Sequence, residues 1–342
     1  MRFDLTLIAA ALAATTAPGP KESFSAAMGA ALQADEVKAL SALDGVDLSS
    51  LPAKDQAAAT CMRERFGPKS RPAPAASDSL ADRALAIYRD YWHTAMLHPQ
   101  LRAAEEQRLE TRLRKLLGAP KQADLDALEP RLSDALKKDG LHSLQGRTGL
   151  LRELMIWGKQ DEKLVPVDLP DGQYRAKVEY LDGFQSFGWS HYATCGRAAT
   201  GGWATEEALF AVVPRYESFD GEEFKVSFLG HETQHFSDKA RFKDLKSWEL
   251  EYRAKLVELA FADTTRAKVL QRFVVDQGTD PESPHSYANR AVLSDMVKRL
   301  QLKSADDLFT VDLARLHEAA RATLLEDSQK RAAAQAVPIP TN

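Results

Sequence analysis

Cysteine is scarce in this chain, because only Cys61 and Cys195 among its 342 residues are cysteines. Two thiols cannot build a disulfide-rich scaffold or a four-cysteine zinc module. Any metal site must therefore use histidine and carboxylate ligands. The two cysteines can form one disulfide if the chain reaches an oxidising compartment, and the sequence leaves open whether they lie close enough to do so.

An excess of positive charge is also missing. The chain has 45 Lys and Arg residues and 49 Asp and Glu residues, which gives a formal net charge of -4. A dedicated nucleic-acid-binding domain usually has a clear basic excess, so we expect no nucleic-acid partner. Hydrophobic residues make up 44% of the chain and charged residues 27%, which excludes a wholly disordered or fibrous protein.

Long apolar runs are absent except near the N-terminus. The run 5–14 follows Arg2 and precedes small residues and Pro18, which is the pattern of a secretory signal peptide. This run is too short to span a bilayer, and no later segment is long and apolar enough to do so. We therefore expect residues 1–17 to be a signal peptide and the mature chain, without an integral membrane span, to be periplasmic or secreted. The alternative is a disordered leader on a cytoplasmic protein.

The first half of the chain has the patterns of helices. Residues 18–76 are rich in Ala, Ser, Pro and Lys and predict a flexible segment with short helices over 35–43 and 53–66, followed by a proline-rich linker over 67–74. Residues 77–160 form a predicted helical region. Apolar residues at helical spacing predict its helices over 80–95, 101–117, 123–138 and 150–157.

The second half, residues 161–330, begins with strand patterns and ends with helices. Strands are predicted over 164–167 and 174–180, joined by a Pro170-Asp171-Gly172 turn, and again over the apolar run 208–213. Helices are predicted over 231–238, 250–262, 264–275, 288–300 and 306–328, and residues 331–342 have the composition of a disordered tail. This order predicts an α+β fold that is mainly helical, with a small mixed or antiparallel sheet.

The chemistry is concentrated in the pattern His-Glu-x-x-His, formed by His231, Glu232 and His235. Residues four apart lie on one face of a helix, so the two imidazoles can bind one metal ion. Glu232 is one step round the helix, where a base acting on a metal-bound water should lie. We expect a Zn²⁺ site with an open coordination position.

A third ligand must come from elsewhere in the chain. A metzincin would have Gly and His where this sequence has Asp238 and Arg241, so that class is excluded. Glu251 is the favoured ligand, because the small Ala254 one turn later allows two helices to approach closely. Glu249 and Asp238 are the alternatives. Asp238 shares the histidines' face and could instead orient an imidazole.

With these residues, the segment 208–263 resembles zincin metallopeptidases of the gluzincin type, although the spacing to Glu251 is shorter than in the best-known examples. The resemblance implies a zinc-dependent peptidase that acts on peptides or proteins. It also implies that a strand, here 208–213, lines the substrate cleft before the metal-binding helix.

A donor for the developing oxyanion is expected from residues 284–289, just before a predicted helix, where His285 or Tyr287 could reach the site. The sequence thus predicts a zinc-dependent hydrolase, with a peptide bond as the favoured substrate. Two other functions stay open. One is a helical binding or scaffold protein whose metal site is structural or vestigial, and the other is a metal-dependent hydrolase of a non-peptide bond.

Overall fold

The structure is a computed structural model that describes residues 18–336, and these divide into two compact units. The first unit comprises the described residues up to Ile156 together with Gln185–Ala199, and the second comprises Trp157–Phe184 together with the described residues from Thr200 onward. This division differs from the predicted boundaries after residues 76 and 160, because the chain passes between the units three times. The predicted signal peptide, 1–17, lies outside the described residues.

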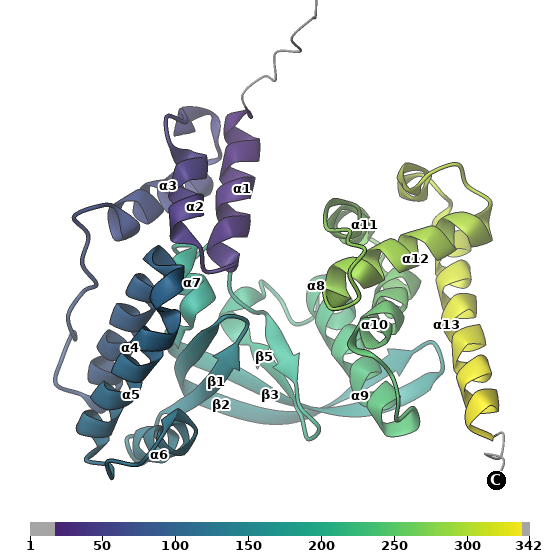
Figure 1. Ribbon diagram of the computed structural model, residues 1–342. Helices are drawn as coiled ribbons and strands as arrows, with labels where there is room; N and C mark the ends of the chain where they lie inside the picture. The colour runs from purple at the N-terminus through teal and green to yellow at the C-terminus, as the bar shows by residue number, and fades with distance from the viewer. Residues whose placement is uncertain (1–17, 337–342) are drawn as a thin grey trace, which may run out of the picture. The chain divides into compact units, whose positions relative to one another are not determined.

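The first unit is mainly helical. Its helices are α1 (Pro20–Leu32), α2 (Glu36–Leu43), α3 (Ala53–Phe66), α4 (Leu80–Leu97), α5 (Arg102–Leu117), α6 (Leu125–Lys138) and α7 (Trp189–Ala193) (Figure 1). The helices predicted over 35–43, 53–66, 80–95, 101–117 and 123–138 are confirmed within a few residues.

Helix α1 escaped the sequence analysis because its buried side chains are mostly small. Ala27 and Ala31 are fully buried, and Phe24 contributes the large apolar group. An alanine-rich helix carries little of the amphipathic contrast that identifies a helix from sequence. These residues join the same core as Tyr88 and Trp92 of α4, so the segment expected to be flexible is packed.

A disulfide joins Cys61 on α3 to Cys195, just after α7. The two cysteines are 134 residues apart in the sequence. The structure therefore answers the question that the sequence left open. Closing so long a loop restricts the unfolded chain, which is the main way in which a disulfide stabilises a fold.

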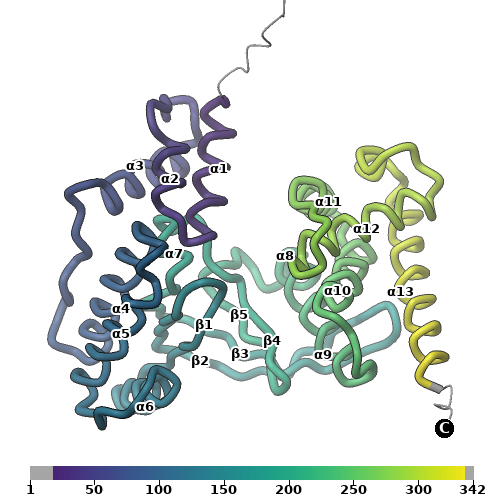
Figure 2. The backbone as a smooth tube through the Cα atoms, viewed as in Figure 1, coloured from purple at the N-terminus to yellow at the C-terminus, as the bar shows by residue number. Residues whose placement is uncertain are grey.

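The sheet has five strands in the order β1-β2-β3-β5-β4, and Figure 2 shows the chain path through it. These strands are β1 (His142–Thr148), β2 (Leu151–Leu169), β3 (Gly172–Phe187), β4 (Gly202–Ala204) and β5 (Leu209–Val212). Strand β5 pairs parallel to β3 and antiparallel to β4, so the sheet is mixed. The predicted strands 164–167, 174–180 and 208–213 are confirmed, as is the mainly helical α+β class.

The helix predicted over 150–157 is wrong, because these residues form the start of β2. Leu151 and Leu154–Trp157 are all buried, so the segment has no exposed face. An apolar run of this length lacks the periodicity that separates a strand from a buried helix. Pairing with the neighbouring strands β1 and β3, which the sequence pattern does not reveal, decides the outcome.

The second unit carries the C-terminal helices. They are α8 (Glu222–Phe224), α9 (His231–Arg241), α10 (Ser247–Phe261), α11 (Arg266–Val275), α12 (Pro284–Leu300) and α13 (Leu313–Ala336). Their core is formed by side chains such as Leu256 and Leu259 of α10, Met296 of α12 and Leu324 of α13. In the described part of the chain, none of the helices combines the length and apolar character needed to cross a membrane.

Two helix boundaries differ from prediction in this unit. The last helix, predicted over 306–328, is split into a 3-10 turn at Ala305–Phe309 and α13. The side chain of Asp307 caps that turn by accepting hydrogen bonds from the backbone N–H groups of Lys303 and Ser304, both at 3.0 Å. Helix α13 reaches Ala336, so 331–336, expected in the disordered tail, are helical. Residues 337–342 lie outside the described part.

Replacing both cysteines, Cys61→Ser with Cys195→Ser, should lower the free energy of unfolding by about 2–5 kcal/mol, because the unfolded chain regains the freedom of the long loop. Urea denaturation of the variant and the wild type measures this difference. Thiol titration of unreduced wild-type protein should find no reactive thiol. Two titratable thiols together with equal stability would contradict the disulfide.

Candidate metal centre

The two histidines lie in the first turns of α9, directly after a π-helical turn at Lys225–Gly230. The apolar side chains of that turn, Val226, Phe228 and Leu229, are buried and anchor the start of the helix in the core. Gly230 allows α9 and α10 to approach closely, because a Cβ atom there would lie 3.3 Å from Cγ1 of Val257, tighter than an ordinary van der Waals contact. The helix predicted to begin at 231 thus continues a helical segment that starts at Glu222.

Helices α9 and α10 run antiparallel, as expected for a third ligand on a second helix. Only five residues, 242–246, connect them. The contacts show this, because His231 meets Glu258 while His235, one turn later on α9, meets Glu251, which lies earlier on α10. This arrangement places Glu251 opposite both histidines.

Three possible ligand atoms converge between these helices. The Nε2 atoms of His231 and His235 are 3.1 Å apart, and they lie 3.5 Å and 3.3 Å from the two carboxylate oxygens of Glu251. Zinc bonds of 2.0–2.1 Å in a tetrahedron place neighbouring ligand atoms about 3.3 Å apart. The three side chains are buried, and their spacing and chemistry fit a zinc ion with one further position open.

Glu258 contacts His231 on Nδ1, the ring nitrogen that points away from the candidate metal position. Its Oε1 atom lies 2.9 Å from Nδ1 of His231, and its Oε2 atom accepts a hydrogen bond from Arg272. A carboxylate on the far ring nitrogen fixes the tautomer that presents Nε2, which is how metal-binding histidines are commonly oriented. Because Glu258 is almost completely buried, this contact is shielded from water.

The charges at the centre shift the pKa values of its members. Burial alone would raise the pKa of Glu251, but hydrogen bonds with His231, His235 and His285 outweigh it and hold this pKa well below its usual range. Burial would lower the pKa of His231, and hydrogen bonds to Glu251 and Glu258 instead raise it to about 9. The pKa of Glu258 falls to about 2 for the same reason, through His231. Both glutamates are therefore carboxylates, the form a metal ion requires.

The two alternative ligand candidates, Asp238 and Glu249, interact with other side chains. Asp238 is fully buried against Arg253, with two contacts of 2.8 Å, so it neither binds a metal nor orients an imidazole. Glu249 accepts a hydrogen bond from the backbone of Lys246 at 2.8 Å and pairs with Arg331 at 3.0 Å. Of the three carboxylates that the sequence offered, only Glu251 meets the histidines.

Glu232 is half-buried on the neighbouring face of α9, as its place in the motif predicts. Burial raises the pKa of Tyr216, and the charge of Glu232 adds to this rise. The hydroxyl of Tyr216 donates to the backbone oxygen of Gly201 at 3.0 Å, just before the edge strand β4. Among the described residues, Glu232 makes no hydrogen bond or ion pair, so its carboxylate is available to a substrate or a water molecule.

The two expected oxyanion donors have different surroundings. His285 places its Nδ1 atom 2.8 Å from Oε2 of Glu251, and its side chain is 67% exposed. It therefore lies beside the ligand cluster and remains open to solvent. Tyr287 packs its ring edge-on against Trp248, with 4.9 Å between ring centroids. Both residues belong to the first turn of α12, which begins at Pro284 rather than at the predicted 288.

Sequence reasoning missed Glu258, Lys255 and Tyr216. Lys255 and Glu258 follow Glu251 by four and seven residues, so helical spacing alone puts all three on one face of α10. The Nζ atom of Lys255 lies 3.6 Å from Oε2 of Glu251. Tyr216 had no such signal, because it lies in the segment between β5 and α8, whose tertiary path the sequence pattern does not reveal.

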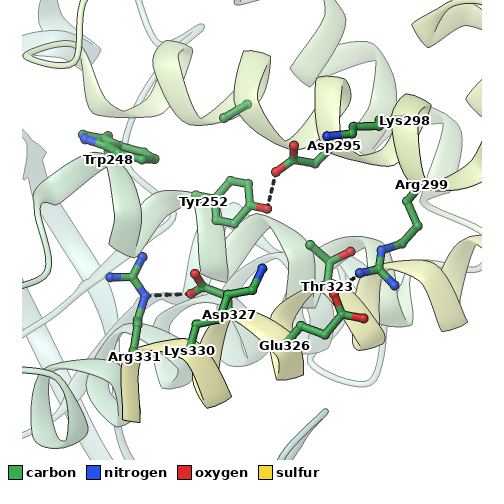
Figure 3. Close-up of a pocket in the computed structure, with 11 residues that line it drawn as sticks. Trp248, Tyr252, Asp295, Lys298, Arg299, Thr323, Glu326, Asp327, Lys330 and Arg331 are labelled. Atoms are coloured by element: carbon green, nitrogen blue, oxygen red, sulfur yellow. Dashed lines mark hydrogen bonds and ion pairs between the residues drawn. The ribbon is translucent and has the colours of Figure 1, made fainter. Parts of the chain in front are cut away.

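A separate pocket of about 590 Å³ opens between α10, α12 and α13 (Figure 3). Tyr252, which follows Glu251 directly on α10, lines it, so it lies on another face of that helix. Each of its three carboxylates has a partner in the pocket: the hydroxyl of Tyr252 donates to Asp295 at 2.6 Å, Arg331 contacts Asp327 at 2.7 Å, and Arg299 contacts Glu326.

Comparisons with protein family models, curated proteins and solved structures found no match for this chain.

Removing a ligand should remove the metal. Purified wild-type protein should contain close to one zinc ion per chain, and His235→Ala and Glu251→Ala should lose most of it, because each removes one of three protein ligands. Glu249→Ala is the matched control and should keep its zinc. Metal analysis by mass spectrometry, after dialysis against zinc-free buffer, measures all four proteins. Full zinc content in His235→Ala would contradict the site.

Glu258→Gln tests the support behind His231. The amide keeps the size of the side chain but cannot match the carboxylate as an acceptor from Nδ1, so zinc affinity should fall about 10–100-fold. Competition with a fluorescent zinc chelator measures the affinity. An unchanged affinity would show that His231 keeps its orientation without Glu258.

Proposed function

We propose that this chain is a zinc-dependent hydrolase and that its substrate is a peptide bond. One observation carries the proposal: the buried Nε2 atoms of His231 and His235 lie 3.1 Å apart, and each lies within 3.5 Å of a carboxylate oxygen of Glu251. Structural zinc sites usually close the tetrahedron with four protein ligands, whereas catalytic sites use three and leave a position for water. The three-ligand set thus favours catalysis over a structural metal site.

When bound, a zinc ion would supply Lewis-acid activation of water and of the substrate carbonyl. Glu232 would accept a proton from the attacking water and return it to the leaving amine, acting first as general base and then as general acid. Its half-buried place and lack of a partner among the described residues suit that role. His285, exposed beside Glu251, would donate to the negative charge that develops on the carbonyl oxygen.

The sheet edge supports a peptide as the substrate. Strand β4 stands at the end of the strand order and pairs with β5 on one side. An edge strand can pair with an extended peptide through backbone hydrogen bonds. Helix α9, which carries Glu232, contacts β4, and the hydroxyl of Tyr216 bonds to Gly201 just before that strand. A peptide along β4 would therefore pass close to the proposed base.

The disulfide between Cys61 and Cys195 supports the further proposal that the protein works outside the cytoplasm. Disulfides persist in oxidising compartments such as the periplasm and the extracellular space, and cytosolic thiols are normally kept reduced. This agrees with the leader pattern that predicts export.

Glu232→Gln separates catalysis from metal binding. The amide keeps the size of the side chain but cannot accept the proton from water, so hydrolysis should fall about 10²–10⁴-fold while zinc content and stability stay unchanged. Turnover of a mixed peptide library, read by mass spectrometry, measures activity, and zinc is quantified in the same samples. Glu217→Gln, an exposed glutamate before α8, is the control and should retain full activity.

The outcomes of this experiment are distinct. Loss of zinc from Glu232→Gln would show that Glu232 is a ligand or a structural anchor instead of the base. Equal turnover in wild type and variant, with both inhibited by a chelator, would assign the base to another group. No turnover of any peptide by zinc-loaded wild type would contradict the proposed substrate.

A further inference from the structure

The first unit contains a pocket of about 630 Å³ that has no part in the proposed hydrolase mechanism. Three arginines line it: Arg65 from α3, Arg71 from the segment that follows, and Arg89 from α4. Aromatic rings of Trp92, Phe187 and Tyr192 form part of its wall. The pocket thus combines guanidinium groups with an apolar surface.

Its positive charge is uncompensated, because no aspartate or glutamate is among the residues that line it. Neither Arg71 nor Arg89 forms an ion pair within the described residues. The pocket in Figure 3 differs in this respect, because carboxylates line it as well and two of them form ion pairs with Arg299 and Arg331. Like charges gathered without counter-charges favour binding of an anion from solution.

Nearby carboxylates do not supply the missing charge. Asp90, next to Arg89 in sequence, pairs with Arg112 on α5. Glu36 interacts electrostatically with Arg65. The carboxyl group of Glu36 is buried without a hydrogen-bond partner, however, and burial raises the pKa of Glu36 to about 8. Glu36 is therefore mostly uncharged at neutral pH. Burial, together with the charge of Arg89, also lowers the pKa of Arg65.

Arg65 is held in a fixed position by Tyr192. The guanidinium of Arg65 lies over the ring of Tyr192, 4.5 Å from its centroid, and donates a hydrogen bond to the backbone oxygen of Tyr192. A guanidinium fixed in this way loses little further freedom when it binds a ligand. The disulfide from Cys195, which also lines the pocket, joins α3 to the segment that carries Tyr192.

We propose that this pocket binds an organic phosphate monoester, with the phosphate on Arg65, Arg71 and Arg89 and the organic group against the aromatic wall. A phosphate monoester carries a charge of about −1.5 to −2 near pH 7 and offers three acceptor oxygens, which suits several guanidinium groups better than a single carboxylate does. The pocket volume is far larger than one phosphate needs and lies in the range of pockets for small organic ligands. The proposal is independent of the metal centre.

Phenyl phosphate is the probe, and isothermal titration calorimetry of the full chain measures its binding. We expect saturable binding at one site per chain. Arg71→Gln and Arg89→Gln should each weaken it at least about tenfold, because a hydrogen bond to a charged group is lost. The matched control is Arg83→Gln, which lies on the same helix as Arg89, is exposed and does not line the pocket. Its affinity should equal that of the wild type.

Two further ligands test the chemistry. Inorganic phosphate should bind about tenfold more weakly than phenyl phosphate because it lacks the aromatic contact, and benzoate should bind more weakly because it carries a single charge. If inorganic phosphate or benzoate bound as tightly as phenyl phosphate, the phosphate-ester assignment would be overturned.

Three other results would also overturn the proposal: no saturable binding of phenyl phosphate, the same affinity in Arg83→Gln and Arg89→Gln, or binding that survives Arg89→Gln and is lost in His235→Ala. The last result would place the phosphate at the metal centre. Circular dichroism of each variant confirms that it is folded.

Discussion

Two carboxylates buried on one face of α10 determine how the second unit is arranged around its candidate metal centre. Glu251 and Glu258 are seven residues apart and both largely excluded from water. An ionised carboxylate is stable in such a place only when charged or hydrogen-bonding partners surround it. His231 and His235 from α9, Lys255 from the same helix and Arg272 from α11 supply those partners. The ligand geometry is thus one part of a larger charge network.

A second buried charge pair sets the relation between the helices that carry this network. Arg253, fully buried, contacts Asp238 of α9 and the side chains of Asp327 and Ser328 of α13. Breaking such a pair leaves an uncompensated buried charge, so sliding α9 along α10 would be costly. Apolar packing alone tolerates such shifts more easily. The pair therefore helps to hold the histidines opposite Glu251.

The centre was predictable from sequence where its residues follow helical spacing, and only there. His231, Glu232 and His235 share one short segment, and Glu251 could be preferred to Glu249 because adjacent faces of a helix point to different neighbours. Tyr216 could not be found, because its electrostatic interaction with Glu232 depends on the tertiary path of a loop. The strand over 151–157 was missed for a related reason, since its state depends on partners distant in sequence. Local pattern thus predicted the candidate ligands, while long-range pairing determined their surroundings.

Charge balance separates the pockets of this protein more clearly than size does. The pockets lined by Arg331 and by Arg65 have similar volumes, about 590 and 630 Å³, and both contain aromatic rings. In the first, each carboxylate of the lining meets a basic or hydroxyl group, so its polar groups stabilise the packing of three helices. In the second, arginines stand together without acidic partners, and their mutual repulsion disfavours the empty state. No acidic side chain lines the second pocket, so an anionic ligand there would meet arginines and no opposing carboxylate. The absence of counter-charges is therefore a more informative criterion for a binding site than volume.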